Sequence, residues 1–165
     1  MSTVPEALGV LRRSAAARPL LTYYDQGTGE RTELSGATFD NWVAKTASYL
    51  TEELDLERGE SLGVDLPCHW MSAIFAAAAW SLGVVVEAES HAQERAAARD
   101  AARVVVCGPD TLNDHQATGG RHVVACALHP LATRFATPLP AGVRDFGVEV
   151  WGQPDAFTPW DPPEP

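Results

Sequence analysis

Helical segments alternate with short β-branched runs through the middle of the chain, and this order constrains the fold more than any other feature. Unbroken apolar runs of this kind are typical of strands that are buried on both faces of a sheet. Helices between such strands imply right-handed crossovers. We therefore predict an α/β fold, layered α/β/α, with a mostly parallel sheet. The predicted strands are residues 61–66, 84–86, 103–107 and 122–127, and the predicted helices are residues 35–54, 69–82 and 93–102.

The regions on either side of this core have simpler patterns. Residues 5–18 have the spacing of a short amphipathic helix, and residues 20–25 and 30–34 predict a β-hairpin around a Gln-Gly-Thr-Gly turn. Residues 146–151 predict one further strand. Residues 154–165 are rich in proline and acids, which predicts an extended or disordered segment. The predicted organisation is an N-terminal helix (1–19), an α/β domain (20–152) and a Pro-rich acidic tail (153–165).

Composition narrows the class of partner. The 165 residues are 45% hydrophobic, enough for one domain with a sizeable core. The formal net charge of -10 opposes binding to nucleic acid or to an anionic membrane surface. The start of the chain lacks a signal-peptide pattern, and the longest apolar stretch is shorter than the ~20 residues needed to span a bilayer. Cys68, Cys107 and Cys126 cannot all pair within one chain, so we expect reduced, mostly buried thiols in a cytoplasmic protein.

Three motifs resemble known sequences. Leu34-Ser-Gly-Ala-Thr-Phe-Asp-Asn-Trp-Val-Ala-Lys-Thr-Ala resembles, without gaps, the first core motif of adenylate-forming (AMP-binding) enzymes, the group of acyl-CoA synthetases, peptide-synthetase adenylation domains and luciferases. Trp80-Ser-Leu-Gly-Val-Val-Val is similar to their second core motif, Leu-Lys-Ala-Gly-x-x-x-x-Pro. Phe146-Gly-Val-Glu-Val-Trp is similar to a small actinobacterial family with distant AMP-binding-enzyme similarity. The resemblance implies a truncated relative with the fold of the N-terminal subdomain of these enzymes.

The departures from the motifs bear on activity. Gly36 replaces the usual tyrosine, Ser81 replaces the usual lysine, and Glu87 with Ala88 stands where a proline is expected. The conserved chemistry of the family would require a glycine-rich, lysine-bearing phosphate loop and a later second lysine. This chain has a single lysine, Lys45, in the middle of a predicted helix. We therefore expect no ATP-dependent ligation by this chain alone, no strong binding of ATP or AMP, no cofactor and no catalytic residue.

Four residues form the candidate ligand site. Asp65, Cys68, His69 and Trp70 follow a predicted strand, and ligands gather at the carboxyl ends of parallel strands in open α/β sheets. A nucleophilic pair of Cys68 and His69 would need hydrogen-bond contact between the two side chains. The alternative is the start of a helix, with a buried thiol and a tryptophan that covers the sheet.

Two further patterns favour structural roles. His115, His122 and His129 recur at an interval that matches no zinc-binding spacing, so we predict no metal site from them. Arg95, Arg99 and Arg103 form a helical stripe that could bind an anion, although a solvated helix face explains it better. A separate group of polar residues, 110–120, predicts a short helix or loop.

Two functional hypotheses follow. The first is a non-catalytic homologue of adenylate-forming enzymes that acts by binding a ligand or a protein. The second is the N-terminal part of a split acyl-CoA synthetase-like ligase that another polypeptide completes. A weaker third hypothesis is a small-molecule enzyme that uses Asp65, Cys68 and His69. Self-association or a partner protein is expected in the first two cases, because a truncated half would expose apolar surface.

Overall fold

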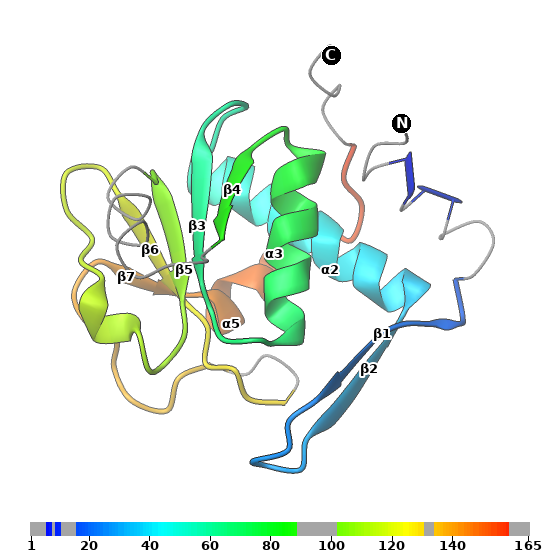
Figure 1. Ribbon diagram of the computed structural model, residues 1–165. Coiled ribbons are helices and arrows are strands. Elements are labelled where there is room, and N and C mark those ends of the chain that lie inside the picture. Colours follow the sequence, from blue (N-terminus) through cyan, green and yellow to red (C-terminus); the bar gives the residue numbers. More distant parts are fainter. Residues whose placement is uncertain (1–5, 8, 11–15, 89–101, 131–133, 159–165) are drawn as a thin grey trace.

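The computed structural model describes residues 6–7, 9–10, 16–88, 102–130 and 134–158. Its centre is a five-stranded parallel sheet with the strand order β4-β3-β5-β6-β7, and a separate two-stranded hairpin lies beside the helices (Figure 1). The sheet strands are β3 (Ser61–Asp65), β4 (Val85–Ala88), β5 (Val104–Cys107), β6 (His122–Ala125) and β7 (Val143–Asp145). All of their pairings are parallel. The predicted α/β class with a mostly parallel sheet is therefore confirmed.

Two helices cover one face of this sheet. They are α2 (Gly36–Ser48) and α3 (Trp70–Ser81), and both predicted helices are confirmed. The Ser35 hydroxyl caps α2 by accepting a hydrogen bond from the Thr38 N–H at 3.2 Å. The predicted helix over 35–54 changes form near its end, where η1 (Tyr49–Glu53) is a π-helical turn. There the Thr51 hydroxyl donates to two backbone carbonyl oxygens, which loosens regular helix geometry.

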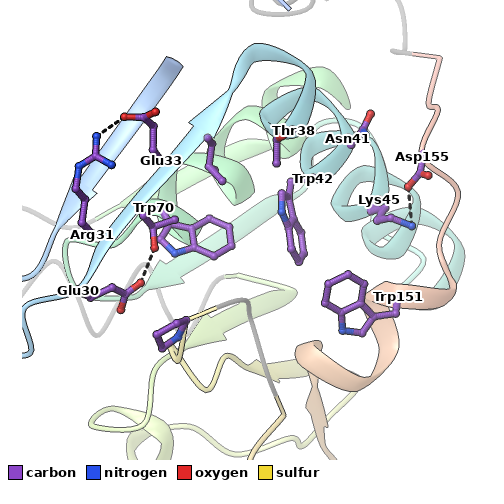
Figure 2. A pocket seen from close by; sticks show the side chains of 13 residues that line it. Glu30, Arg31, Glu33, Thr38, Asn41, Trp42, Lys45, Trp70, Trp151 and Asp155 are labelled. Atoms are coloured by element: carbon purple, nitrogen blue, oxygen red, sulfur yellow. Dashed lines mark hydrogen bonds and ion pairs between the residues drawn. The ribbon is translucent and has the colours of Figure 1, made fainter. Parts of the chain in front are cut away.

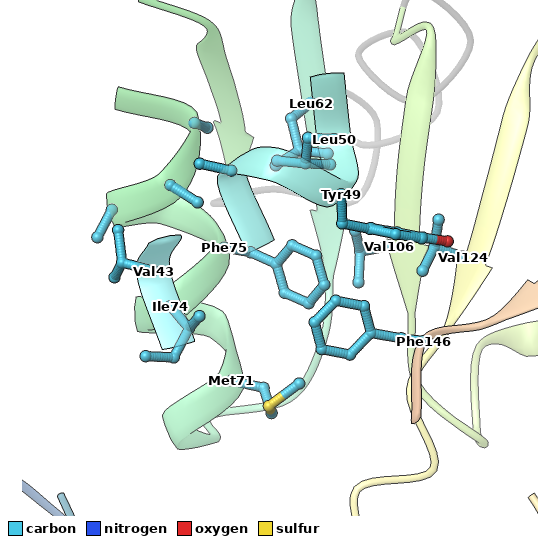
Figure 3. Packing of buried hydrophobic residues seen from close by; sticks show 14 of the residues in the cluster. Val43, Tyr49, Leu50, Leu62, Met71, Ile74, Phe75, Val106, Val124 and Phe146 are labelled. Carbon is cyan, nitrogen blue, oxygen red and sulfur yellow. The ribbon is translucent and has the colours of Figure 1, made fainter. Parts of the chain in front are cut away.

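The hydrophobic core lies between these helices and the sheet (Figure 3). Alternate residues of β5 and β6 point into it, while their neighbours face the other side of the sheet. Phe75 of α3 and Phe146 meet with ring centroids 4.8 Å apart, and Tyr49 packs edge-on against Phe146 at 5.5 Å. The Tyr49 hydroxyl donates to Glu149 at 2.8 Å, and burial raises its pKa above the usual value. Phe146 thus ties the C-terminal part of the described chain to the main core.

The segment that follows β7 corrects one prediction. Residues 146–151 are not a strand but a short helix, α5 (Phe146–Glu149), followed by the 3-10 turn η3 (Val150–Gly152). The Asp145 carboxylate accepts a hydrogen bond from the Gly147 N–H at 3.0 Å and so caps the helix. Phe146 and Val150 are buried at helical spacing, which the alternating sequence pattern concealed.

The hairpin prediction is confirmed by β1 (Pro19–Tyr24) and β2 (Arg31–Ser35), which pair antiparallel. Asp25 organises its turn, because its carboxylate accepts hydrogen bonds from the Gly27 N–H and the Thr28 hydroxyl, both at 2.8 Å. Residues 110–120 contain the short 3-10 helix η2 (Leu112–Asp114), as predicted.

Several predictions fall on residues outside those described. The predicted helix over 93–102 lies almost wholly outside them, as do most of the N-terminal helix and the end of the tail. On the face of the sheet opposite the main core, Val123 and Ala125 pack against Leu112 of η2 and against Phe135. No helix in the described ranges is long and apolar enough to cross a membrane.

The cysteines follow the sequence prediction in part. Cys107 and Cys126 are buried and Cys68 is exposed, and all three thiols are free. Burial raises the pKa of Cys107 to about 12 and that of Cys126 well above its usual value. The two buried thiols are therefore unreactive core residues at neutral pH.

Candidate ligand site at the strand ends

A crevice of about 650 Å³ opens at the carboxyl ends of β3 and β5. We call it the strand-end crevice. Its apolar walls are Val64, Leu66, Pro67, Ala73, Pro109 and Leu128. Its polar side chains are Asp65, Cys68, His69, Ser72, Asp110 and Thr111. The volume lies in the range of typical small-molecule sites, which is ~300–1,000 Å³. Parallel strands that end at one edge of the sheet create this opening.

The four residues predicted as a ligand site divide between two cavities. Asp65, Cys68 and His69 line the strand-end crevice. Trp70 lines a different pocket, described below, and packs in the main core. The division occurs at the first turn of α3, because consecutive side chains at a helix start point in different directions.

Asp65 is held in a buried network that joins the ends of β3 and β5. Its carboxylate lies 2.7 Å from His115 Nε2, and the two side chains are 10% and 1% exposed. The Thr111 hydroxyl donates to the Asp65 carbonyl oxygen at 3.0 Å and accepts from the Gly108 N–H at 3.3 Å. The loop after β5 is thus fastened to β3. The sequence spacing predicts no metal site at His115 and gives no indication of this partner.

The His69 ring contains a buried donor that has no partner in the described structure. Its Nδ1 accepts the Met71 N–H at 3.2 Å and so caps α3, which leaves the ring hydrogen on Nε2. That Nε2 is buried and has no hydrogen-bond partner in the described structure. Burial lowers the pKa of His69, while the nearby Glu30 and Asp25 charges act in the opposite direction. The ring packs against Tyr23 at 4.7 Å, so a neutral, fixed imidazole lies beside the crevice.

The geometry does not join Cys68 and His69 as a nucleophilic pair. Cys68 is exposed, His69 is buried, and Nδ1 of the ring is occupied by the helix cap. The described structure contains no hydrogen bond between the Cys68 sulfur and the imidazole. Activation of the thiol by this histidine would need that contact.

A second cavity, of about 710 Å³, lies between the hairpin, α2, η3 and the residues that follow η3 (Figure 2). We call it the tryptophan pocket and define it by Trp42, Trp70, Trp151, Lys45 and Asp155. Trp42 stands edge-on to Trp70 at 5.5 Å and to Trp151 at 5.4 Å. The Lys45 ammonium pairs with the Asp155 carboxylate at 2.8 Å. Sequence reasoning missed this pocket, because its walls come from segments more than 100 positions apart.

The remaining candidates do not assemble into a site. Among the described residues, no group of three or more His, Cys, Asp or Glu side chains is placed to hold a metal ion. Arg103 pairs with Glu60 at 3.0 Å, whereas Arg95 and Arg99 lie outside the described ranges.

The chain is similar to known proteins in two ways. It is 34% identical over 163 residues to the "TIGR03089 family protein" of Mycobacterium tuberculosis. That alignment covers 96% of this chain and 63% of the relative, so the chain spans less than two thirds of the relative's length. No protein-family model matches the chain.

The structural similarities identify the fold. The acyl-CoA synthetase of Brucella canis superimposes with a TM-score of 0.73 at 18% identity, over 90% of this chain and 27% of that enzyme. The anthranilate CoA ligase AuaEII, in complex with anthranoyl-AMP, superimposes with a TM-score of 0.73 at 15% identity. The match covers 98% of this chain and 29% of that ligase. The N-terminal subdomain of Klebsiella oxytoca NpsA, in complex with 3-hydroxybenzoyl-AMSN, superimposes with a TM-score of 0.60 at 18% identity. The match covers 76% of this chain and 30% of that chain. The chain therefore has the fold of the N-terminal part of adenylate-forming enzymes.

Proposed function

We propose that this chain binds a small uncharged acyl compound in the strand-end crevice and does not itself adenylate a carboxylate. One observation carries the proposal. The crevice has apolar walls, the described residues that line it include no cationic side chain, and His69 in its wall has a buried Nε2–H without a hydrogen-bond partner in the described structure. A carbonyl oxygen that reached this buried nitrogen would accept its hydrogen bond, and the apolar walls can hold the attached hydrocarbon.

The charges at the crevice oppose a nucleotide. A polyphosphate is held by lysine, by magnesium or by a loop of backbone N–H groups. The crevice instead carries the carboxyl side chains of Asp65 and Asp110. Lys45, the only lysine in the sequence, lies in the tryptophan pocket. The same carboxylates repel a free carboxylate ligand, which favours an ester, thioester or amide.

Two of the proteins with this fold support the choice of an acyl group. AuaEII is in complex with anthranoyl-AMP, and the NpsA N-terminal subdomain is in complex with 3-hydroxybenzoyl-AMSN. Both ligands carry an aromatic acyl unit. For the present chain we propose that an acyl unit is retained as the ligand while the nucleotide is not.

Calorimetry and an activity assay test the proposal together. S-benzoyl-N-acetylcysteamine is a neutral thioester, and we expect it to bind the purified chain more tightly than benzoate, with no detectable heat for ATP. ATP–pyrophosphate exchange with a panel of carboxylates is expected to stay at the level of the blank. Tight ATP binding or exchange above the blank would overturn the proposal.

A pair of matched variants tests the location. Ala73 of α3 lines the crevice, whereas Ala76, one turn further along the same helix, does not. Both side chains are partly buried. Ala73→Leu is expected to fill the crevice and abolish thioester binding, and Ala76→Leu is expected to preserve it. Equal losses in both variants would place the ligand elsewhere.

A second candidate function is the N-terminal part of a ligase that another polypeptide completes. Val85 of β4, the strand at the end of the described sheet, and Trp80 of α3 favour it, because each is 51% exposed. Exposed apolar side chains next to an edge strand are suited to a protein contact. We propose that such a partner, or a second copy in self-association, covers these two side chains in the cytoplasm.

Light scattering and co-purification decide this second candidate. If a partner polypeptide restores ATP–pyrophosphate exchange and Trp80→Glu abolishes the association, the split-ligase function is supported. If the wild-type chain is monodisperse and monomeric and no polypeptide co-purifies with it, this candidate is rejected.

A further inference from the structure

The tryptophan pocket is a second cavity with its own chemistry. It lies on the other side of the start of α3 from the strand-end crevice, and the two cavities share no lining residue. The hairpin, α2, η3 and the residues that follow η3 all contribute to it (Figure 2). The acyl ligand proposed above makes no use of this cavity.

Its aromatic walls suit a planar ring. Trp42 stands between Trp70 and Trp151, and each of the two pairs meets edge to face. Trp151 is 56% exposed, so part of this wall is open to an incoming ligand. Trp70 is 3% exposed, and its indole N–H has no hydrogen-bond partner in the described structure. An aromatic ligand would bury more of Trp151 and could stack or meet the other rings edge-on.

The charged groups define the polarity of the pocket. The Lys45 side chain is 17% exposed, and its ammonium pairs with Asp155, whose side chain is 67% exposed. Asp155 lies in a segment, residues 154–158, without helix or strand. Lys45 also donates a hydrogen bond to the Gln153 carbonyl oxygen. The mostly buried Lys45 ammonium is therefore neutralised by an exposed carboxylate on an irregular segment. The carboxylate of a ligand could take the place of Asp155 in this ion pair.

The other charges at the pocket set the orientation of a ligand. Arg31 is paired with Glu33, and Glu30 accepts a hydrogen bond from the Thr32 hydroxyl. Figure 2 shows Glu30 beside Trp70, on the opposite side of the pocket from Lys45. A negatively charged group is therefore repelled at the Trp70 side and attracted at the Lys45 side.

We propose that the tryptophan pocket binds a planar aromatic anion, with its ring against Trp42 and Trp151 and its carboxylate on Lys45 in place of Asp155. Asp155 is then an internal competitor, and its removal should strengthen binding. Stronger binding after the removal of Asp155 distinguishes the proposal from a purely apolar pocket. Ligand affinity for an apolar pocket would not depend on the Asp155 charge. The site is independent of the strand-end crevice and of the acyl ligand proposed there.

Three probes that share one ring system test the required charge. They are 2-naphthoate, 2-naphthamide and 2-naphthylmethylammonium, each titrated by calorimetry at pH 7.5 into the full chain. We expect 2-naphthoate to bind most tightly and the ammonium compound most weakly. Equal affinities, or a preference for the ammonium compound, would overturn the proposal.

Variants of the ion pair test its mechanism. Lys45→Met is expected to weaken 2-naphthoate binding about tenfold or more, the loss typical of one charge-assisted hydrogen bond. Asp155→Asn is expected to tighten binding about twofold to fivefold, the range for opening one partly exposed ion pair. Unchanged or weaker binding by Asp155→Asn would contradict the exchange of carboxylates. Circular dichroism of each variant verifies the fold.

Indole resonances locate the ligand. In a two-dimensional proton–nitrogen NMR spectrum, the indole signals of Trp42, Trp70 and Trp151 should shift with 2-naphthoate, while that of Trp80 on the outer surface of α3 should not. Trp151→Ala should weaken binding and Trp80→Ala should leave it unchanged. If the shifts are confined to backbone amides of the strand-end crevice, the anion binds elsewhere. Equal losses of affinity in the two tryptophan variants would lead to the same conclusion.

Discussion

His69 and Trp70 are neighbours in the sequence but line different cavities, and the comparison of these cavities is instructive. The strand-end crevice is built by a rule of topology, since parallel strands end at one edge and their following loops surround an opening. The tryptophan pocket is built by long-range packing, since α2 and the residues after η3 meet there although they lie more than 100 positions apart. Only the first kind of cavity can be anticipated from local sequence patterns.

The two cavities also differ in charge. The strand-end crevice has two aspartates and the buried His69 among its described walls, and burial lowers the pKa of that imidazole. The tryptophan pocket contains the only lysine of the chain, paired with Asp155. The first therefore favours an uncharged ligand and the second an anion. The variants below should separate the two cavities, and they are ordered from the largest expected effect to the smallest.

Phe146→Ala should have the largest effect and should damage the tryptophan pocket first. Phe146 is buried against Phe75 and Tyr49, and its ring centroid lies 6.4 Å from that of Trp42. Loss of a core phenylalanine costs about 3–5 kcal/mol of unfolding free energy. Urea denaturation measures that loss, and calorimetry should show that naphthoate binding falls more than thioester binding. A loss below about 1 kcal/mol would show that this ring is not the link between the C-terminal segment and the core.

Asp65→Asn should act on the strand-end crevice alone. The substitution removes the charge that faces His115 across 2.7 Å in a buried site. A buried hydrogen bond to a charged group contributes about 1.5–3 kcal/mol, so we expect a loss in that range by urea denaturation. Asp110→Asn, at an exposed residue of the same crevice, is the control and should be close to neutral. Equal stability of the two variants would show that the network at the strand ends is dispensable.

His69→Ala should remove the cap of α3, at a cost of about 1 kcal/mol. It should also alter the pH dependence of stability. The pKa of His69 is lower in the folded state than its ordinary 6.5, so the unfolded chain binds more protons below that pH. The stabilisation from the neutral ring is complete above pH 6.5 and is lost as the pH falls below it.

Urea denaturation at a series of pH values between 7.5 and 5 checks this sign. In the wild type, the contribution of His69 makes the free energy of unfolding decrease as the pH is lowered. In His69→Ala this free energy should decrease less steeply. Asp25 and Glu30 face the ring and remain in both proteins, which makes the comparison like for like. An identical slope in the two proteins would contradict the proposed neutral state.

Arg103→Gln should have the smallest effect and serves as a baseline for both cavities. Arg103 pairs with Glu60 at 3.0 Å, but both side chains are substantially exposed. Exposed pairs of this kind contribute about 0–1 kcal/mol, and salt weakens them. Thermal denaturation at low and high salt should detect little change, and neither ligand should lose affinity. A large loss would indicate that this edge of the sheet supports the crevice.

The sequence allowed much of the fold to be predicted because local signals agreed with the tertiary structure. Ser35 is a helix cap in both, and the β-branched runs of β5 and β6 are buried strands. The segment at Phe146 was mispredicted because its apolar residues fit both an alternating strand and a short helix. The Asp145 cap and the burial of Val150 favour the helix, and both depend on contacts that a local pattern does not contain.

The candidate site was predicted less completely. Asp65, Cys68 and His69 were found because a strand end is visible in the sequence, but the partner of Asp65, His115, lies 50 positions away. The sequence indicates Lys45 only as a single lysine without a phosphate loop around it. Its contact with Asp155 depends on how the C-terminal segment folds over α2, so no spacing rule could have indicated it.

The most direct test of the central claim is an amide NMR titration of the labelled chain with S-benzoyl-N-acetylcysteamine. If the strand-end crevice binds an acyl group, the shifted amides should cluster within residues 65–73 and 108–111, and the signals around Lys45 and Trp151 should stay in place. An absence of saturable shifts, or shifts centred on the tryptophan pocket, would contradict the claim that the strand ends of this fold retain an acyl-binding site.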